Sequence, residues 1–371
     1  MESDDEFFDA KEYDEESIAR RTLKLSLRSN SQAQTKTKKP ADFSDISQIS
    51  QITLPFNSTS WTIKFNPDGT HLAIAGNQGT ILLYSIGKNE ILYNPIQLNE
   101  HSYDITSLSW SSQKTLLSSS IDHTVKEWGI QGSSLATFNY HCKVVSCAYL
   151  PQDNNFFIAI FEDFVIRNVH IPTKHIVNSV QLFGNIYCLA LSPSGNTVAV
   201  GLDKGLVLPF RVRETDFKLI DLPIIEAKNR RGFKRKGKKV TGLHIVNDEE
   251  IIITTLDSNI RRYSLQDSLM KQKYKGAALK NKEFCAVVTY DKEYVICGSE
   301  KGRFLVWKYQ LAEKLKNHDY ESVRGNKSNV AEYVAVAPES VVDVINREKG
   351  SDITYLVVTI DMGNLLKIYT C

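Results

Sequence analysis

The chain has 371 residues, 42% of them hydrophobic, and a formal net charge of +2. It is long enough to bury a large core, and its bulk charge predicts no particular partner. No apolar run approaches the ~18 residues that a membrane span needs, and the acidic N-terminus is unlike a signal or transit peptide. The six cysteines form no CxxC pair, so we expect them to be small buried hydrophobes in a reducing compartment.

The N-terminal region separates its charges. Residues 1–17 carry nine acids and one base, whereas residues 18–39 carry seven bases and no acid. Such polar sequence cannot bury enough apolar area to offset the entropy lost on ordering. We therefore predict a disordered tail over residues 1–47, with a basic linker at 18–39.

Beyond the tail, the chain repeats itself. The stretches LLSSSIDHTVKEW, IITTLDSNIRRY and VICGSEKGRFLVW each join two short apolar runs through a turn. An aromatic or apolar residue near the end of each third run can be followed along the chain, mostly at intervals of about 40–45 residues. These residues are Tyr84, Trp128, Val169, Phe210, Tyr263, Trp307 and Tyr369.

This spacing predicts an all-β fold of seven four-stranded units, a seven-bladed β-propeller. Their first three strands are expected at about 60–86, 104–130, 143–171, 185–212, 239–265, 283–309 and 329–370. Two longer intervals contain insertions at 228–239, 311–328 and 346–352. The seventh unit lacks a fourth strand, and we expect SQITLPF (50–56) to supply it and close the ring within residues 48–371.

The second unit resembles a WD40 repeat. It carries His101, Ser118 and Ser120 on one strand face, Asp122 in the turn, and then Trp128. In WD repeats these residue types form a hydrogen-bonded network that fixes the turn, so the resemblance implies a structural network of His101, Ser118 (or Ser120), Asp122 and Trp128.

Two other units keep only part of this pattern. The third has His141 and Asp163 but Val169 in place of tryptophan, and the fourth has Asp203 but Phe210.

Two stretches resemble a narrower family, the WD-repeat proteins that act as effectors of the recycling-endosome Rab GTPase (rabphilin-like WD proteins). These are residues 104–128 and residues 230–276, in which a basic loop precedes TLDSNIRRY and KYKG. The resemblance implies a Rab-type GTPase in its GTP form as a partner. This chain is shorter before the propeller than members of that family.

The acidic segment EFFDAKE matches the pattern E-F-F-D-A-x-E at every defined position. It resembles the motif of two phenylalanines in an acidic tract (FFAT) that binds VAMP-associated proteins of the endoplasmic reticulum. Acidic residues would steer the peptide to a basic face, and a phenylalanine would anchor it in an apolar pocket. The predicted partner-binding residues are Glu6, Phe7, Phe8, Asp9, Ala10 and Glu12.

A basic loop holds eight bases in twelve residues: Lys228, Arg230, Arg231, Lys234, Arg235, Lys236, Lys238 and Lys239. It is either an anion- or membrane-binding loop or a solvated connection between blades. Its spacing nearly matches a phosphate-binding loop, but Lys239 stands where a Ser or Thr must bind magnesium. One aromatic, Phe233, gives too little stacking surface to predict nucleic-acid binding.

No catalytic or metal-ligand pattern stands out, so we expect no enzyme activity, cofactor, metal or small-molecule substrate. We predict a monomeric scaffold of membrane traffic, cytoplasmic and peripheral to endoplasmic-reticulum and endosomal membranes. Its expected partners are a VAMP-associated protein, a Rab-type GTPase and an anionic membrane surface. The alternative is a general protein-interaction platform or ubiquitin-ligase substrate receptor without a membrane role.

Overall fold

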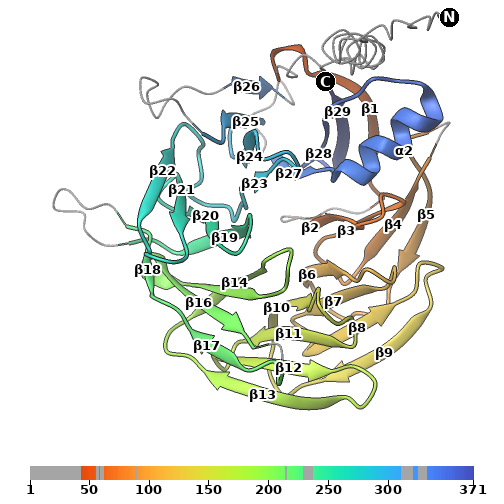
Figure 1. The fold of residues 1–371 in the computed structure, drawn as a ribbon. Helices are drawn as coiled ribbons and strands as arrows, with labels where there is room; N and C mark the ends of the chain where they lie inside the picture. Colours follow the sequence, from red (N-terminus) through yellow and green to blue (C-terminus); the bar gives the residue numbers. More distant parts are fainter. Residues whose placement is uncertain are drawn as a thin grey trace, which may run out of the picture. The chain divides into compact units, whose positions relative to one another are not determined.

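The computed structural model describes residues 43–55, 58, 62–87, 90–213, 215–228, 237–310, 321–324 and 332–371. Within these residues the strands form seven antiparallel sheets arranged as the blades of a ring (Figure 1). Neighbouring innermost strands pack together, and the last blade returns to the first through contacts between β27 and β2. The predicted all-β, seven-bladed β-propeller is confirmed.

The blades follow one another in chain order. Blade 1 comprises β2 (Thr62–Phe65), β3 (His71–Ala75), β4 (Ile81–Ile86) and β5 (Leu92–Leu98). Blade 2 comprises β6 (Ile105–Trp110), β7 (Leu116–Ser120), β8 (Thr124–Trp128) and β9 (Ser134–Asn139). Blade 3 comprises β10 (Val144–Tyr149), β11 (Phe156–Phe161), β12 (Val165–His170) and β13 (His175–Gln181).

Blade 4 comprises β14 (Ile186–Leu191), β15 (Thr197–Leu202), β16 (Leu206–Val212), β17 (Leu219–Asp221) and β18 (Ile225–Glu226), with the 3-10 turn η2 (Asp203–Gly205) between β15 and β16. Blade 5 comprises β19 (Val240–Ile245), β20 (Glu250–Thr255), β21 (Asn259–Ser264) and β22 (Met270–Tyr274). Blade 6 comprises β23 (Val287–Val288), β24 (Tyr294–Ser299), β25 (Arg303–Lys308) and β26 (Glu321–Arg324). Blade 7 comprises β27 (Glu332–Val336), β28 (Leu356–Asp361), β29 (Leu365–Thr370) and β1 (Ser47–Thr53).

The outer strand of blade 7 comes from the other end of the described chain. β1 pairs antiparallel with β29, from Ser47 opposite Thr370 to Thr53 opposite Leu365. The strand expected at 50–56 therefore lies three residues earlier. The difference has a physical reason: an outermost strand is exposed on much of its surface, so the polar segment SQISQIT serves, whereas apolar alternation pointed to the segment after it.

The described residues begin before residue 47, within the range expected to be a disordered tail. Phe43, in the 3-10 turn η1 (Phe43–Asp45), is 1% exposed and stacks on Tyr355 with ring centroids 4.8 Å apart. Its ring also meets the edge of Tyr294. An aromatic anchor of this kind is hidden in a polar sequence context, which is why the sequence placed the boundary too late.

One helix interrupts the strand pattern. α2 (Glu339–Lys349) replaces part of what the sequence showed only as an insertion, and it ends at Gly350, whose φ is +63°. It packs Val341, Val342 and Ile345 into the core shared by the neighbouring blades. Its Ser340 Oγ donates a hydrogen bond of 2.7 Å to the Pro67 carbonyl, so the helix joins blade 7 to blade 1. No helix in the described ranges is long and apolar enough to cross a bilayer.

Candidate partner-binding surfaces

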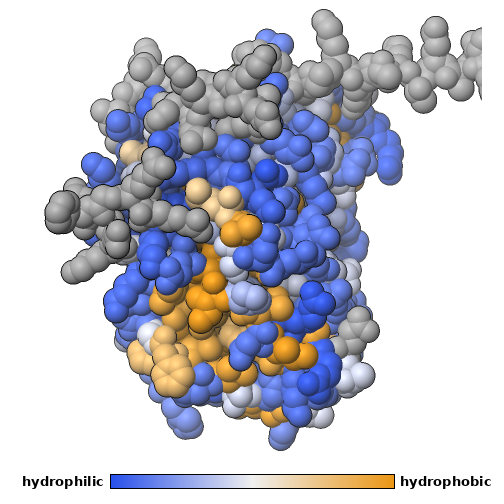
Figure 2. Space-filling view, turned by 60° about the vertical axis from the view of Figure 1, so that its left-hand side comes forward, coloured by the Kyte–Doolittle hydropathy of each residue, from blue (hydrophilic) through white to orange (hydrophobic). Residues whose placement is uncertain are grey.

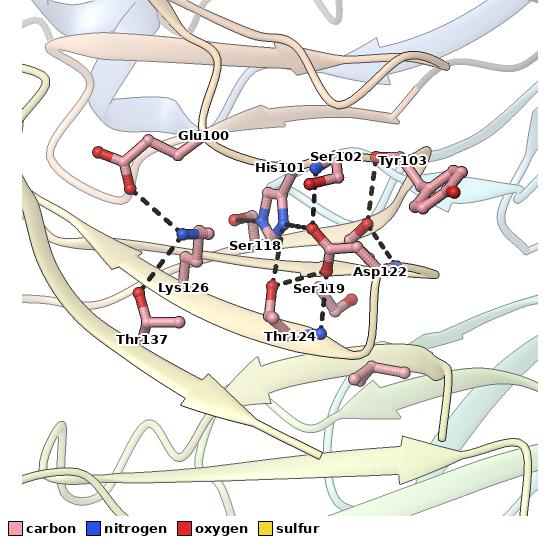
Figure 3. A network of polar contacts seen from close by, with 12 residues as sticks. Glu100, His101, Ser102, Tyr103, Ser118, Ser119, Asp122, Thr124, Lys126 and Thr137 are labelled. Atoms are coloured by element: carbon pink, nitrogen blue, oxygen red, sulfur yellow. Dashed lines mark hydrogen bonds and ion pairs between the residues drawn. The ribbon is translucent and has the colours of Figure 1, made fainter. Parts of the chain in front are cut away.

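The blade 2 network joins three strands or loops around one buried hydroxyl (Figure 3). The Trp128 indole donates to Ser118 Oγ at 2.8 Å, and Ser118 Oγ lies 2.7 Å from His101 Nε2. His101 Nδ1 lies 2.8 Å from Asp122 Oδ2. The structure thus brings together the four residues that the repeat pattern picked out. Ser120 is not part of this chain of bonds, because its hydroxyl donates to backbone carbonyls of the β5–β6 loop.

The bonds run in one direction, from indole to hydroxyl to imidazole to carboxylate. Burial lowers the pKa of His101, and the Asp122 carboxylate offsets this only in part. Burial would raise the pKa of Asp122, but hydrogen bonds from Thr124 and His101 outweigh it and lower that pKa. A neutral imidazole that donates from Nδ1 to an ionised carboxylate satisfies every group, which a buried network requires. The network therefore stabilises the turn between β7 and β8.

In blade 5 the corresponding turn is held by a hydrogen-bonded network built around an arginine. The Arg261 guanidinium, 1% exposed, donates to Thr255 Oγ1 at 2.7 Å and to Asp257 Oδ2 at 2.6 Å. Three defined positions of the stretch TLDSNIRRY are thus held in a buried network beneath the β20–β21 turn. In blade 3, Asp163 likewise pairs with Arg167, and His141 is exposed.

The described ends of the basic loop are partly neutralised. Lys228 pairs with Glu226, and Lys239 pairs with Glu283 while its ammonium lies 3.8 Å from the ring centroid of Tyr187. Lys238 is exposed. Arg230, Arg231, Lys234, Arg235 and Lys236 lie outside the described residues. So do all six predicted motif residues between Glu6 and Glu12 and the basic linker at 18–39.

Sequence reasoning missed an exposed apolar area on the outer strands of blades 3, 4 and 5 and on the segments beside them, which we call the apolar rim. Figure 2 shows the side of the ring that lies to the left in Figure 1, and apolar side chains gather in the lower part of this view. The apolar rim consists of Ile176, Val177, Ile220, Ile224, Leu269 and Met270, each more than a third exposed.

Hydrogen bonds join the segments that carry the apolar rim from one blade to the next. Asn178 Nδ2 of β13 donates to the carbonyl of Phe217, just before β17, at 2.9 Å. Ser268 Oγ, just before β22, donates to the carbonyl of Pro223 at 3.0 Å. The cause lies in blade 4, where β17 and β18 are short and residues 222–224 leave the sheet between them. The segment LIDLPII carried the signal, but in a sequence it resembles a buried strand.

The ring surrounds a central channel of about 1600 Å³, lined by the innermost strands. Its lining is mixed, with polar and apolar residues in similar share, and includes Lys64 and His244. Among the residues that the structure describes, no three His, Cys, Asp or Glu side chains are grouped so that they could hold a metal ion.

Comparison with known proteins gives a consistent result. Residues 94–129, which contain the blade 2 network, match the family description "WD domain, G-beta repeat". The chain is similar to WD repeat-containing protein 44 of Xenopus laevis, with 26% identity over 62% of this chain and 26% of that protein. It is also similar to an uncharacterized WD repeat-containing protein of Schizosaccharomyces pombe (25% identity, 68% of this chain, 48% of that protein). A third similarity is to 2-deoxy-glucose resistant protein 2 of Saccharomyces cerevisiae (26% identity, 57% of this chain, 27% of that protein).

The chain therefore spans between about a quarter and about half of the length of these curated relatives. A WD40 propeller is a protein-interaction scaffold, which fits a ring whose conspicuous surface features are an apolar rim and charged loops. The seven-bladed ring, the hydrogen-bonded network of blade 2 and the matched repeat at 94–129 make this chain similar to WD40-repeat proteins.

Proposed function

We propose that this propeller is a non-catalytic adaptor of membrane traffic with two protein-binding elements and one membrane-binding loop. The segment at 6–12 tethers it to the endoplasmic reticulum through a VAMP-associated protein, and the ring is a platform for a Rab-type GTPase in its GTP form. The observation that carries the tether is the agreement of EFFDAKE with the docking pattern at all six defined positions. Flanking acids would speed the encounter with a basic partner face.

A GTPase partner would need an exposed binding surface on the propeller. Thr255, Asp257 and Arg261 of the family-like stretch are engaged in a buried network, so they explain the shape of blade 5 rather than a contact with a partner. The apolar rim is a better candidate, because exposed contiguous apolar surface is typical of protein–protein contact sites. Charges beside it are already paired, Lys271 with Asp267 and Lys218 with Asp216.

The tether is tested by capture on a purified VAMP-associated protein domain. Changing Phe8 and Asp9 to Ala should reduce capture to background, because the anchoring ring and a defined carboxylate are both lost. Tyr13→Ala is the matched control, since this aromatic lies in the same acidic tract but outside the defined positions. Unchanged capture of the double variant would remove the tether and favour a platform without a membrane role, such as a ubiquitin-ligase substrate receptor.

The platform is tested separately with a GTP-loaded Rab-type GTPase of the recycling-endosome class. Ile220→Asp combined with Ile224→Asp places two charges in the apolar rim and should abolish binding. Leu135→Asp, on the outer strand of blade 2, alters an equally exposed aliphatic residue outside the rim and should bind as the natural sequence does. Equal binding by both proteins would remove the rim from the interface.

The basic loop is a third element of the proposal, and we expect it to contact an anionic membrane. Changing Lys234, Arg235 and Lys236 together to Glu should abolish binding to anionic liposomes, because clusters of bases near such a surface contribute about 1 kcal/mol per charge. Liposome binding that survives this change would leave the loop as a solvated connection.

A further inference from the structure

Three loops of the ring meet at one corner of blade 4. The turn η2 touches the β13–β14 loop, because the Asp203 amide donates to the Asn185 carbonyl at 3.3 Å. It also touches both described ends of the basic loop: the Ala227 amide donates to the Gly205 carbonyl at 2.7 Å, and a Cβ added to Gly237 would lie 1.7 Å from the Lys204 carbonyl oxygen. The backbone thus holds the three loops against one another.

Two kinds of side chain project from this corner. Phe183, in the β13–β14 loop, is 90% exposed and is the most exposed large hydrophobic residue in the described part of the chain. Lys204 and Lys238 are exposed, and neither forms an ion pair with a described acid. The acid nearest to Lys204 in sequence is Asp203, which precedes it directly. The carboxylates of Glu226 and Glu283 are already paired with Lys228 and Lys239.

Lys204 has a left-handed backbone, as Lys114, Lys174 and Lys292 also do. Its φ is +54° and its ψ is +17°, in the left-handed region, and the next residue, Gly205, has a φ of +75°. A side chain other than glycine, asparagine or aspartate is uncommon in that region in proteins generally, but the conformation recurs in the turns of this ring and marks a tight turn. The turn therefore presents a cation at a position where glycine would be the easier residue.

The ring offers internal comparisons, because other blades place the same residue types in equivalent loops. Tyr103, in the β5–β6 loop between blades 1 and 2, is 62% exposed but lies beside the network of His101 and the Asp122 carboxylate. Lys301, in the β24–β25 turn, precedes a left-handed glycine as Lys204 does, but it follows the Glu300 carboxylate, which accepts three backbone amides. Only the blade 4 corner, among these, combines a projecting aromatic ring with unpaired cations.

We propose that this corner is a contact site for an anionic lipid bilayer. Phe183 would enter the interfacial region of the bilayer, where an exposed aromatic ring gains by losing water, and Lys204 and Lys238 would face headgroup phosphates. The proposal rests on the membrane role stated above and adds a defined apolar anchor from the ordered ring to it. One ring and two cations give weak, reversible attachment, so the contact would act together with a second anchor such as the tether.

The test is co-sedimentation of the full chain with vesicles of phosphatidylcholine, alone or with about one-fifth phosphatidylserine. We expect binding only to the vesicles that contain phosphatidylserine, with affinity reduced about tenfold by Phe183→Ala and at least about fivefold by either Lys204→Glu or Lys238→Glu. Tyr103→Ala and Lys301→Glu are the matched controls and should bind as the natural sequence does. Unchanged melting temperatures would show that each variant folds, and Phe183→Ser is a second variant at the fully exposed position.

Three results would overturn the inference: no binding to either kind of vesicle, binding that the corner variants leave intact, or equal losses in the control variants. Loss of capture of a purified protein partner by the corner variants, with vesicle binding unchanged, would assign the corner to that protein instead. Capture on the VAMP-associated protein domain is measured on the same variants and should not change. A failure of the tether and a failure of the bilayer contact are therefore seen in different experiments.

Discussion

Ser118 is the residue on which the blade 2 network depends, because its hydroxyl serves both Trp128 and His101. Ser118→Ala would leave the indole N–H and the imidazole Nε2 without partners in a site closed to water. An unsatisfied buried polar group costs about 1–3 kcal/mol, so we expect the variant to be about 2–4 kcal/mol less stable in urea unfolding. Ser179→Ala, on the exposed face of β13, is the control and should change stability by less than about 0.5 kcal/mol. A Ser118→Ala protein as stable as this control would contradict the role given to the hydroxyl.

His244 should make stability depend on pH. It lines the channel, and burial lowers its pKa to about 4, with the positive charge of Lys64 adding to the effect. The unfolded chain therefore takes up this proton at a higher pH than the folded ring does. The contribution is complete above about pH 6.5 and is lost as the pH falls toward about 4, by up to about 3 kcal/mol. His244→Gln should flatten this part of a plot of unfolding free energy against pH, and His175→Gln, at an exposed position, should leave the slope unchanged.

At the scale of single residues, sequence reasoning reached the blade 2 network with one alternative left open, and it missed the network of blade 5. The spacing of His101, Asp122 and Trp128 pointed to the contacts, but it could not choose between Ser118 and Ser120, which share a strand face. Arg261 looked like a surface base within NIRRY, since only the fold shows that its guanidinium is enclosed. The same limit applies to Phe43, whose burial depends on tyrosines far away in sequence.

Among the elements, α2 and the turn beneath it offer a close test of packing. A Cβ added to Gly69 would lie 2.6–2.7 Å from backbone atoms of Ser340 and Val341, and the φ of Gly69 is +79°. We expect Gly69→Ala to lower the free energy of unfolding by about 2–4 kcal/mol, because clash and backbone strain add. Gly350→Ala measures the cost of backbone strain alone, because the φ of Gly350 is +63° but nothing lies within 4 Å of an added Cβ. It should cost about 1 kcal/mol, and equal melting temperatures for the two variants would show that α2 does not press on the turn.

The sequence was informative about strands and much less so about the connections between them. Strands such as β11 are short and continuously apolar, and turn residues bound them, so their positions followed from the pattern. Only the end of α2 falls in the insertion expected at 346–352, whereas its buried residues Val341, Val342 and Ile345 lie in the range 329–370 that was expected to form strands. The apolar rim was invisible for a different reason, since exposure depends on what neighbouring strands fail to cover.

At the scale of the whole ring, internal repetition carried the prediction, because seven similar units close only as a propeller. The period revealed the number of blades even where the hydrogen-bonded residues had changed. Closure is less visible in a sequence, since β1 joins β29 through backbone pairing and carries few apolar side chains. The seam between blades 7 and 1 is thus held by β1 on the outer edge and by α2 against the Pro67 turn.

The stability of the whole ring should depend on this seam, and two truncated chains test this prediction. A chain that starts at Phe43 keeps η1 and β1 and should melt at the temperature of the full chain. A chain that starts at Leu54 loses both β1, which pairs with β29, and the Phe43 side chain, which packs on Tyr355. Removing a buried phenylalanine alone costs about 3–5 kcal/mol, so we expect a melting temperature lower by about 10 °C or more in calorimetry. Adding the peptide of residues 43–55 should restore part of the loss by pairing with the open edge of β29. Equal melting of the two truncated chains would mean that blade 7 is stable with three strands and that the ring does not need its N-terminal strand to stay closed.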